Sequence, residues 1–124
     1  MVYTFDIFDT LITRLVGNPY VKFSYEQFLT LKNYEHIIVY GAGEAAKALI
    51  DQLHFRNLNI KAVAVSDISN NPEYLRSIKI YPIDELLEYR KSAVVVVAVT
   101  KKYASGIEDN LRQLGFENIV TELN

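Results

Sequence analysis

The sequence contains no cysteine, which excludes disulfide bonds, thiolate catalysis and cysteine-ligated metal sites. Its two histidines, His36 and His54, have neither a second histidine nor a carboxylate at the spacing of metal ligands, so no metal site is expected. The net charge is −2 and basic residues form no block, so nucleic acid and anionic membranes are not expected partners. The longest apolar run, residues 93–99, is far too short to span a bilayer. Because residues 1–6 also lack the pattern of a signal peptide, we expect a cytoplasmic protein.

What the chain does contain is a regular alternation of strand and helix patterns after residue 34. Of its 124 residues, 50% are hydrophobic and 23% are charged, which is ordinary for a globular domain with a real core. The expected strands are residues 37–40, 60–65, 78–81, 93–99 and 116–120, and the expected helices are residues 44–55, 82–90 and 103–114. Such alternation predicts an α/β fold, a parallel sheet of about five strands in the order 3-2-1-4-5, with helices on both faces.

Two details of this pattern are specific enough to check. The run of valine and alanine at residues 93–99 is typical of a strand buried on both faces. In the helix expected at residues 44–55, the apolar positions repeat on one side, so Lys47, Asp51 and Gln52 are expected to face away from the sheet.

The first 33 residues differ from the rest, and we divide the chain into an arm at residues 1–33 and a domain at residues 34–124. The arm has a strand pattern at residues 2–8, a turn at residues 17–19 and a short helix pattern at residues 24–31. Alternation places Tyr3, Phe5 and Ile7 on one face, which is costly to leave in water. We therefore expect an ordered arm, packed on its own sheet or on a second copy in a homodimer.

The most informative motif is the turn Gly41-Ala42-Gly43, which joins the first expected strand to the first expected helix. Gly41 can adopt backbone angles closed to other residues, and Gly43 lacks the Cβ that would keep a pyrophosphate from the main chain. The N–H groups and dipole of the following helix favour an anion at the same point. The motif therefore predicts phosphate binding, although Glu44 would repel a phosphate unless its side chain turns away.

Further candidate ligand contacts follow the ends of the other expected strands. Asp67 stands near the roughly 20-residue spacing at which Rossmann proteins place an acid on the ribose hydroxyls, and no arginine follows it, so NAD is favoured over NADP. Asp67 is equally interpretable as a turn residue. Thr100 and Lys101 follow the buried strand at its carboxyl end, where ligands bind in open α/β sheets. The expected ligand contacts are Gly41, Ala42, Gly43, Glu44, Ala45, Asp67, Thr100 and Lys101.

Residues 34–120 resemble the nucleotide-binding Rossmann domains of bacterial polysaccharide-biosynthesis proteins, including UDP-sugar-binding domains of some sugar acetyltransferases. The matching segments are Val-Tyr-Gly-Ala-Gly-Glu-Ala at residues 39–45, Ala-Val-Ala-Val-Ser-Asp at residues 62–67, residues 78–86, and residues 94–99 before Thr100. The resemblance implies a nucleotide or nucleotide-sugar ligand, such as NAD or a UDP-sugar, and a link to surface-polysaccharide biosynthesis.

Residues 1–14 resemble the first motif of haloacid-dehalogenase-type hydrolases, in which Asp6 would be the nucleophile. The usual second aspartate, two residues later, is replaced by Phe8. No later acidic pair completes a magnesium site, so an active phosphatase is not expected.

Redox catalysis is also not expected, because none of the nine tyrosines has a lysine four residues later, as short-chain dehydrogenases require. Three functions remain: non-catalytic binding of a nucleotide or nucleotide-sugar, a structural or interaction module without a ligand, and an inactive phosphatase fragment. We favour the first.

Overall fold

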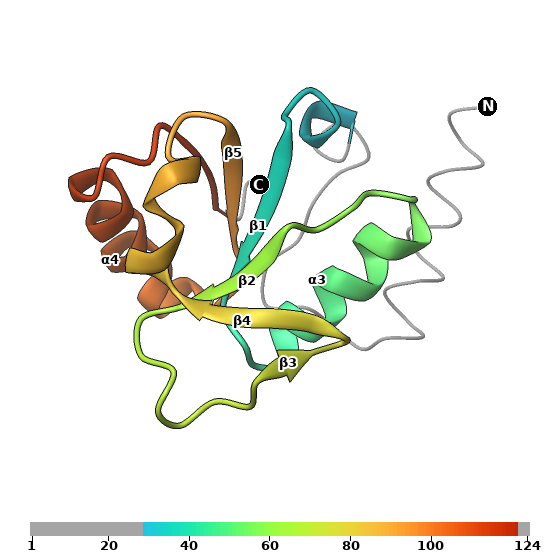
Figure 1. Ribbon diagram of the computed structural model, residues 1–124, viewed down its shortest axis with the longest axis horizontal. Helices are drawn as coiled ribbons and strands as arrows, with labels where there is room; N and C mark the ends of the chain where they lie inside the picture. The colour runs from blue at the N-terminus through green and yellow to red at the C-terminus, as the bar shows by residue number, and fades with distance from the viewer. Residues whose placement is uncertain (1–28, 122–124) are drawn as a thin grey trace.

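The structure is a computed structural model that describes residues 29–121, and these residues form one sheet with helices against both faces (Figure 1). The elements in chain order are β1 (His36–Tyr40), α3 (Glu44–Phe55), β2 (Ala62–Val65), β3 (Tyr74–Leu75), β4 (Ile78–Pro82), the 3₁₀ helix η1 (Ile83–Tyr89), β5 (Ala93–Val97), α4 (Lys101–Gln113) and β6 (Asn118–Val120).

The sheet has six strands in the order β3-β4-β2-β1-β5-β6. Every pair is parallel except β3 with β4, which are antiparallel. In the centre, Ile38 of β1 lies opposite Ala62 of β2 on one side and Val95 of β5 on the other. The five parallel strands therefore stand in the predicted order, and the α/β fold of Rossmann type is confirmed.

The two faces of the sheet bury separate apolar cores. In β1, Ile37 and Val39 face α3, whereas Ile38 and Tyr40 face the side covered by α4 and η1. Strand alternation places successive side chains on opposite faces in this way. All five residues of β5 are buried, as predicted for a central strand covered on both sides. Figure 1 shows α3 in green and α4 in orange to red on opposite sides of the sheet.

Four local expectations were incomplete or wrong. The two-residue strand β3 was missed, because the turn that joins it to β4 consists of Arg76 and Ser77, both at positive φ, rather than the usual glycine or asparagine. The helix expected at residues 82–90 is a 3₁₀ helix over Ile83–Tyr89, interrupted by the non-helical angles of Leu86. Gln52 is buried, so its expected outward position is wrong.

The fourth concerns the buried strand, which was expected to run to residue 99. β5 ends at Val97, although the N–H of Ala98 still donates to the carbonyl oxygen of Tyr40 at 2.8 Å. Beyond that bond the chain turns toward α4.

The predicted strand, turn and most of the helix in residues 1–33, and the first motif around Asp6, lie outside the described residues. Within them, residues 29–31 are helical, and Leu31 is buried in the core on the α3 side of the sheet. No helix in residues 29–121 combines the length and apolar character needed to cross a membrane.

Candidate functional site

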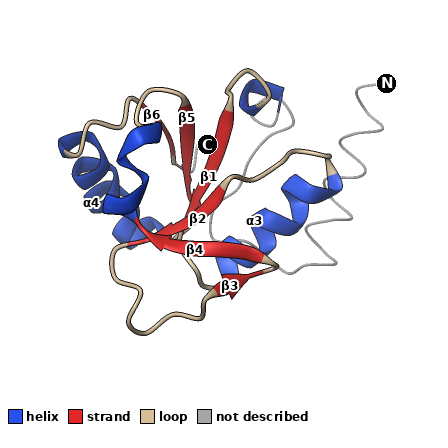
Figure 2. Cartoon of the chain, viewed as in Figure 1, coloured by secondary structure: helices blue, strands red, loops and turns tan. Residues whose placement is uncertain are grey.

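The candidate site is the carboxyl edge of the sheet, where β1 and β5 lie side by side and their chains leave in opposite directions. β1 leads to α3 on one face, and β5 leads to α4 on the other (Figure 2). Such a divergence between neighbouring parallel strands leaves a crevice above their ends, and ligands of open α/β sheets bind there. The expected contacts around Gly41 and Thr100 therefore come from the two sides of one crevice.

Gly41 occupies the tightest point of the turn after β1. Its φ is +124°, and an added Cβ would lie 2.6 Å from the carbonyl oxygen of Ala98 and 3.2 Å from Cγ1 of Val99. Its N–H donates to the carbonyl oxygen of Ala64 in β2 at 2.8 Å. The fold alone thus requires glycine at residue 41, because both the backbone angle and the contact with Ala98 exclude a side chain.

Gly43 is different, because no feature of the fold requires glycine there. It caps α3 at φ −95° and ψ −160°, an extended conformation open to any residue. An added Cβ would meet no heavy atom within 4 Å. Glycine is also a weaker cap than serine or aspartate, whose side chains bond the first N–H groups of a helix. The space in front of α3 is therefore open, as the phosphate interpretation needs.

The charge at the start of α3 is partly neutralised. Glu44 is exposed, and its carboxylate accepts a hydrogen bond from Nζ of Lys47 at 2.9 Å. This hydrogen bond and the ammonium charge lower the pKa of Glu44, so the carboxylate stays ionised at neutral pH. Of the other predicted contacts here, Ala42 is half-buried and Ala45 is buried, so Ala45 has only its backbone N–H to offer a ligand.

Asp67 is the second residue of the loop after β2 and is exposed. Its Oδ1 accepts the N–H of Ser69 at 2.9 Å, and its carbonyl oxygen accepts Nδ2 of Asn71 at 2.9 Å. The hydrogen bond from Ser69 lowers the pKa of the Asp67 carboxyl. The residue therefore has the geometry of a turn former, yet a carboxylate has about four acceptor positions, which leaves room for ribose hydroxyls.

On the β5 side, Thr100 caps α4 and Lys101 is the first residue of that helix. Oγ1 of Thr100 is shielded from solvent and has no hydrogen-bond partner among the described residues. It makes no capping hydrogen bond to α4. A buried hydroxyl without a partner is uncommon, because its desolvation is uncompensated. The first turn of α4 contains no acidic residue, in contrast to that of α3.

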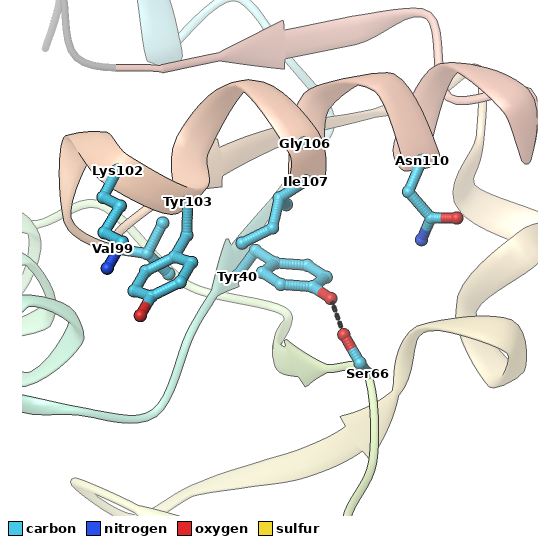
Figure 3. Close-up of a pocket in the computed structure, with 8 residues that line it drawn as sticks. All are labelled: Tyr40, Ser66, Val99, Lys102, Tyr103, Gly106, Ile107 and Asn110. Atoms are coloured by element: carbon cyan, nitrogen blue, oxygen red, sulfur yellow. Dashed lines mark hydrogen bonds between the residues drawn. The ribbon is translucent and has the colours of Figure 1, made fainter.

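A pocket of about 540 Å³ lies beside this crevice, on the α4 face of the sheet (Figure 3). Its lining residues are Tyr40, Ser66, Val99, Lys102, Tyr103, Gly106, Ile107 and Asn110. The hydroxyl of Tyr40 is hydrogen-bonded to Oγ of Ser66, which joins the ends of β1 and β2 across the pocket floor.

Sequence reasoning did not identify this pocket, although a signal was present. Tyr40, Ser66 and Val99 directly precede Gly41, Asp67 and Thr100, which were all predicted contacts. The pocket thus adjoins the three loops that carry the predicted contacts. Among residues 29–121, no group of three or more histidine, aspartate or glutamate side chains is placed to hold a metal ion.

Comparison with known proteins supports the fold independently. A crystal structure of RSP, a Rex-family repressor, aligns with a TM-score of 0.59 and 19% identity over 78% of this chain and 49% of that one. RSP in complex with β-NADH aligns with a TM-score of 0.56 and 19% identity over 78% of this chain and 50% of that one. This chain therefore spans about half the length of these structures, and the likeness shows the fold. No curated protein matches the sequence.

The family comparison is more direct than the structural one. The family model described as C2185-like, N-terminal matches residues 33–119, which include every described strand except the last residue of β6. The match begins just before β1 and takes in the glycine turn, both long helices and the pocket beside α4. The chain belongs to the C2185-like, N-terminal family.

Proposed function

We propose that this chain binds a nucleotide, with NAD(H) as the first candidate, at the carboxyl edge of its sheet and without catalysing a reaction on it. The observation that carries the proposal is Gly43. At Gly41 the fold itself demands glycine, but at Gly43 it leaves open space in front of the α3 N-terminus. A glycine that weakens the helix cap, at a position where a side chain would meet no neighbour, is explained by a ligand that approaches the backbone.

The anion would lie on the first turn of α3. The first backbone bond of this helix runs from the N–H of Lys47 to the carbonyl oxygen of Gly43 at 3.1 Å. The N–H groups of Glu44, Ala45 and Ala46 precede that bond, so the helix offers them no acceptor of its own. Together with the helix dipole, they would bind a pyrophosphate.

Two further residues support a nucleotide over a simple phosphate. Asp67 keeps free acceptor positions on its ionised carboxylate at the end of β2, where a ribose diol would donate. On the opposite side of the crevice, Thr100 caps α4 just after the carboxyl end of β5, where ligands of open α/β sheets bind. Lys101, the first residue of α4, stays a predicted contact on this side.

NAD(H) is placed first because the Rex-family structure of the same fold was determined with β-NADH. A UDP-sugar, with a role in surface-polysaccharide biosynthesis, is the second candidate and rests on the sequence resemblance of residues 34–120. A ligand-free interaction module is the remaining alternative. Catalysis is not proposed, since the chain has no Tyr-x-x-x-Lys pair.

Titration calorimetry of the full chain with NAD⁺, NADH, NADP⁺ and UDP-glucose tests the proposal. We expect NAD⁺ or NADH to bind, and the melting temperature to rise with ligand concentration, because a ligand that binds only the folded state stabilises it. Gly43→Val should abolish binding while the domain remains folded, because the branched side chain would fill the phosphate position.

Gly43→Ser separates a binding role from a structural one. Serine is the better helix cap, so the melting temperature should hold or rise slightly while nucleotide affinity falls. If no nucleotide binds the wild-type chain, the interaction module is the better interpretation. If a nucleotide binds Gly43→Val as tightly as the wild type, the site lies elsewhere.

A further inference from the structure

We propose that the hydrogen bond between the hydroxyls of Tyr40 and Ser66 is a clasp that sets the span between the glycine turn and Asp67 (Figure 3). Tyr40 and Ser66 are then positioning residues, which make the site selective for a ligand whose ribose and phosphates are joined. This role rests on the proposed nucleotide site and adds the feature that makes its two halves act together.

The Tyr40 side of the clasp is fixed by the fold. Tyr40 is buried in the core on the α4 side of the sheet. Its carbonyl oxygen accepts the N–H of Ala98 at 2.8 Å, and the N–H of the next residue, Gly41, donates to the carbonyl oxygen of Ala64 at 2.8 Å. The end of β1 is therefore held by both neighbouring strands, and the hydroxyl of Tyr40 has a defined position on the pocket floor.

The Ser66 side belongs to the loop between β2 and β3, whose first five residues, 66–70, are exposed. The hydrogen bonds that Asp67 accepts come from residues of the same loop, so they shape the loop without tying it to the sheet. In the part of the chain that the structure describes, the bond from Ser66 to Tyr40 is the one hydrogen bond that joins residues 66–70 to β1 or to the glycine turn. The placement of Asp67 relative to that turn therefore depends on the clasp.

Strand register brings the two hydroxyls together. Tyr40 pairs with Ala64 in the parallel ladder, and Ser66 lies two positions beyond Ala64, so alternation places it on the same face. Each residue of the clasp directly precedes a residue of the proposed site, Gly41 in one case and Asp67 in the other. Because a residue moves with its chain neighbour, the bond fixes how far Asp67 lies from the glycine turn.

Loss of the bond should leave the folded state stable. Ser66 is exposed and both residues line the pocket, so water can bond either hydroxyl when its partner is removed. A hydrogen bond that replaces one to water contributes little net free energy of folding. Binding is more sensitive, because a ligand that reaches both the turn and Asp67 depends on the span between them. Free pyrophosphate contacts the turn alone and does not depend on it.

The test uses the full chain and the substitutions Tyr40→Phe and Ser66→Ala, with calorimetry for NAD⁺ and NMR titration for inorganic pyrophosphate. We expect each substitution to raise the Kd for NAD⁺ about three- to tenfold, the range for one net hydrogen bond, and to change the Kd for pyrophosphate less than about twofold. Ser66→Thr keeps the hydroxyl and should retain NAD⁺ affinity. Tyr81→Phe is the matched control and should bind NAD⁺ as the wild type does, because Tyr81 packs against the same core and does not line the pocket.

A double-mutant cycle with Asp67 separates positioning from a general structural effect. If Tyr40 acts through Asp67, Tyr40→Phe should weaken NAD⁺ binding no further in an Asp67→Ala background. Additive losses in this cycle, or equal weakening of NAD⁺ and pyrophosphate, would overturn the positioning role. The cycle decides even where free pyrophosphate binds too weakly to measure.

The outcomes also separate the clasp from the proposed function. Absence of NAD⁺ binding to the wild type would overturn both. NAD⁺ binding that is lost in Gly43→Val yet unchanged in Tyr40→Phe and Ser66→Ala would overturn the clasp and leave the nucleotide site standing. If Tyr40→Phe does not fold, Ser66→Ala decides in its place, because Ser66 is exposed and its truncation leaves the core intact.

Discussion

Replacement of Gly41 by alanine tests the most constrained point of the site, since the structure assigns it two separate costs. The first is the backbone angle of φ +124°, which an L side chain rarely adopts and which costs about 1–3 kcal/mol. The second is the contact between the new Cβ and the carbonyl oxygen of Ala98 at 2.6 Å. Overpacking of this kind costs roughly a further 1–3 kcal/mol, because the carbonyl oxygen of Ala98, one residue past the end of β5, must move.

The sum, about 2–6 kcal/mol, predicts a fall in melting temperature of roughly 10–25 °C for a domain of this size. Thermal and urea unfolding followed by circular dichroism would measure it. Gly43→Ala is the matched control, because its backbone angles are unstrained and its Cβ would meet no neighbour. We expect this control to stay within about 1 kcal/mol of the wild type. A loss at Gly41→Ala no larger than at Gly43→Ala would refute the assignment of Gly41 to the fold.

Two further predictions concern the charges around the proposed ligand. Glu44→Gln should lower the Kd for NAD⁺ about two- to fivefold at low salt, because it removes a negative charge beside the proposed phosphates and releases Lys47 from its ion pair. This gain in affinity should shrink in 1 M salt, which screens the charges. Unchanged affinity at low salt would place the phosphates away from α3. Asp67→Ala should raise the Kd at least fivefold, because the ribose hydroxyls lose their acceptor. Since the pKa of Asp67 is lowered below its usual 3.8, NAD⁺ affinity should stay flat from pH 8 to pH 5 and fall only below about pH 4; a fall centred near pH 6 would contradict this role.

The sequence was sufficient to predict the architecture, because strands and helices are recognised by the period at which apolar residues recur along a short stretch of chain. The valine and alanine run of β5 was typical of a strand covered on both faces, and the apolar repeats of α3 and α4 indicated the helix faces that cover it. Alternating strands and helices then left few arrangements, since crossovers between parallel strands are right-handed. Residues at the ends of those strands, such as Gly41 and Thr100, were identifiable as neighbours for the same reason.

Where local signals were weak, the sequence was a poorer guide. β3 is two residues long and follows no period, and its turn uses Arg76 and Ser77 in a conformation for which neither residue is typical. Gln52 is polar and was expected outside, but it is buried. Burial of a single side chain depends on what packs over it, and residues distant in the sequence decide that.

Only the tertiary structure distinguishes the roles of the two glycines in the turn. In the sequence, Gly41 and Gly43 carry the same motif, and either could serve the fold or a ligand. Only the contact between residue 41 and Ala98, 57 positions later in the chain, shows that Gly41 serves the fold, and only the open space at residue 43 leaves room for a ligand. The pocket beside α4 has the same origin, because Tyr40, Ser66 and Gly106 are brought together by three different elements. Chain periodicity fixes which elements form and how they are ordered, whereas steric contact and open volume exist only once those elements have packed.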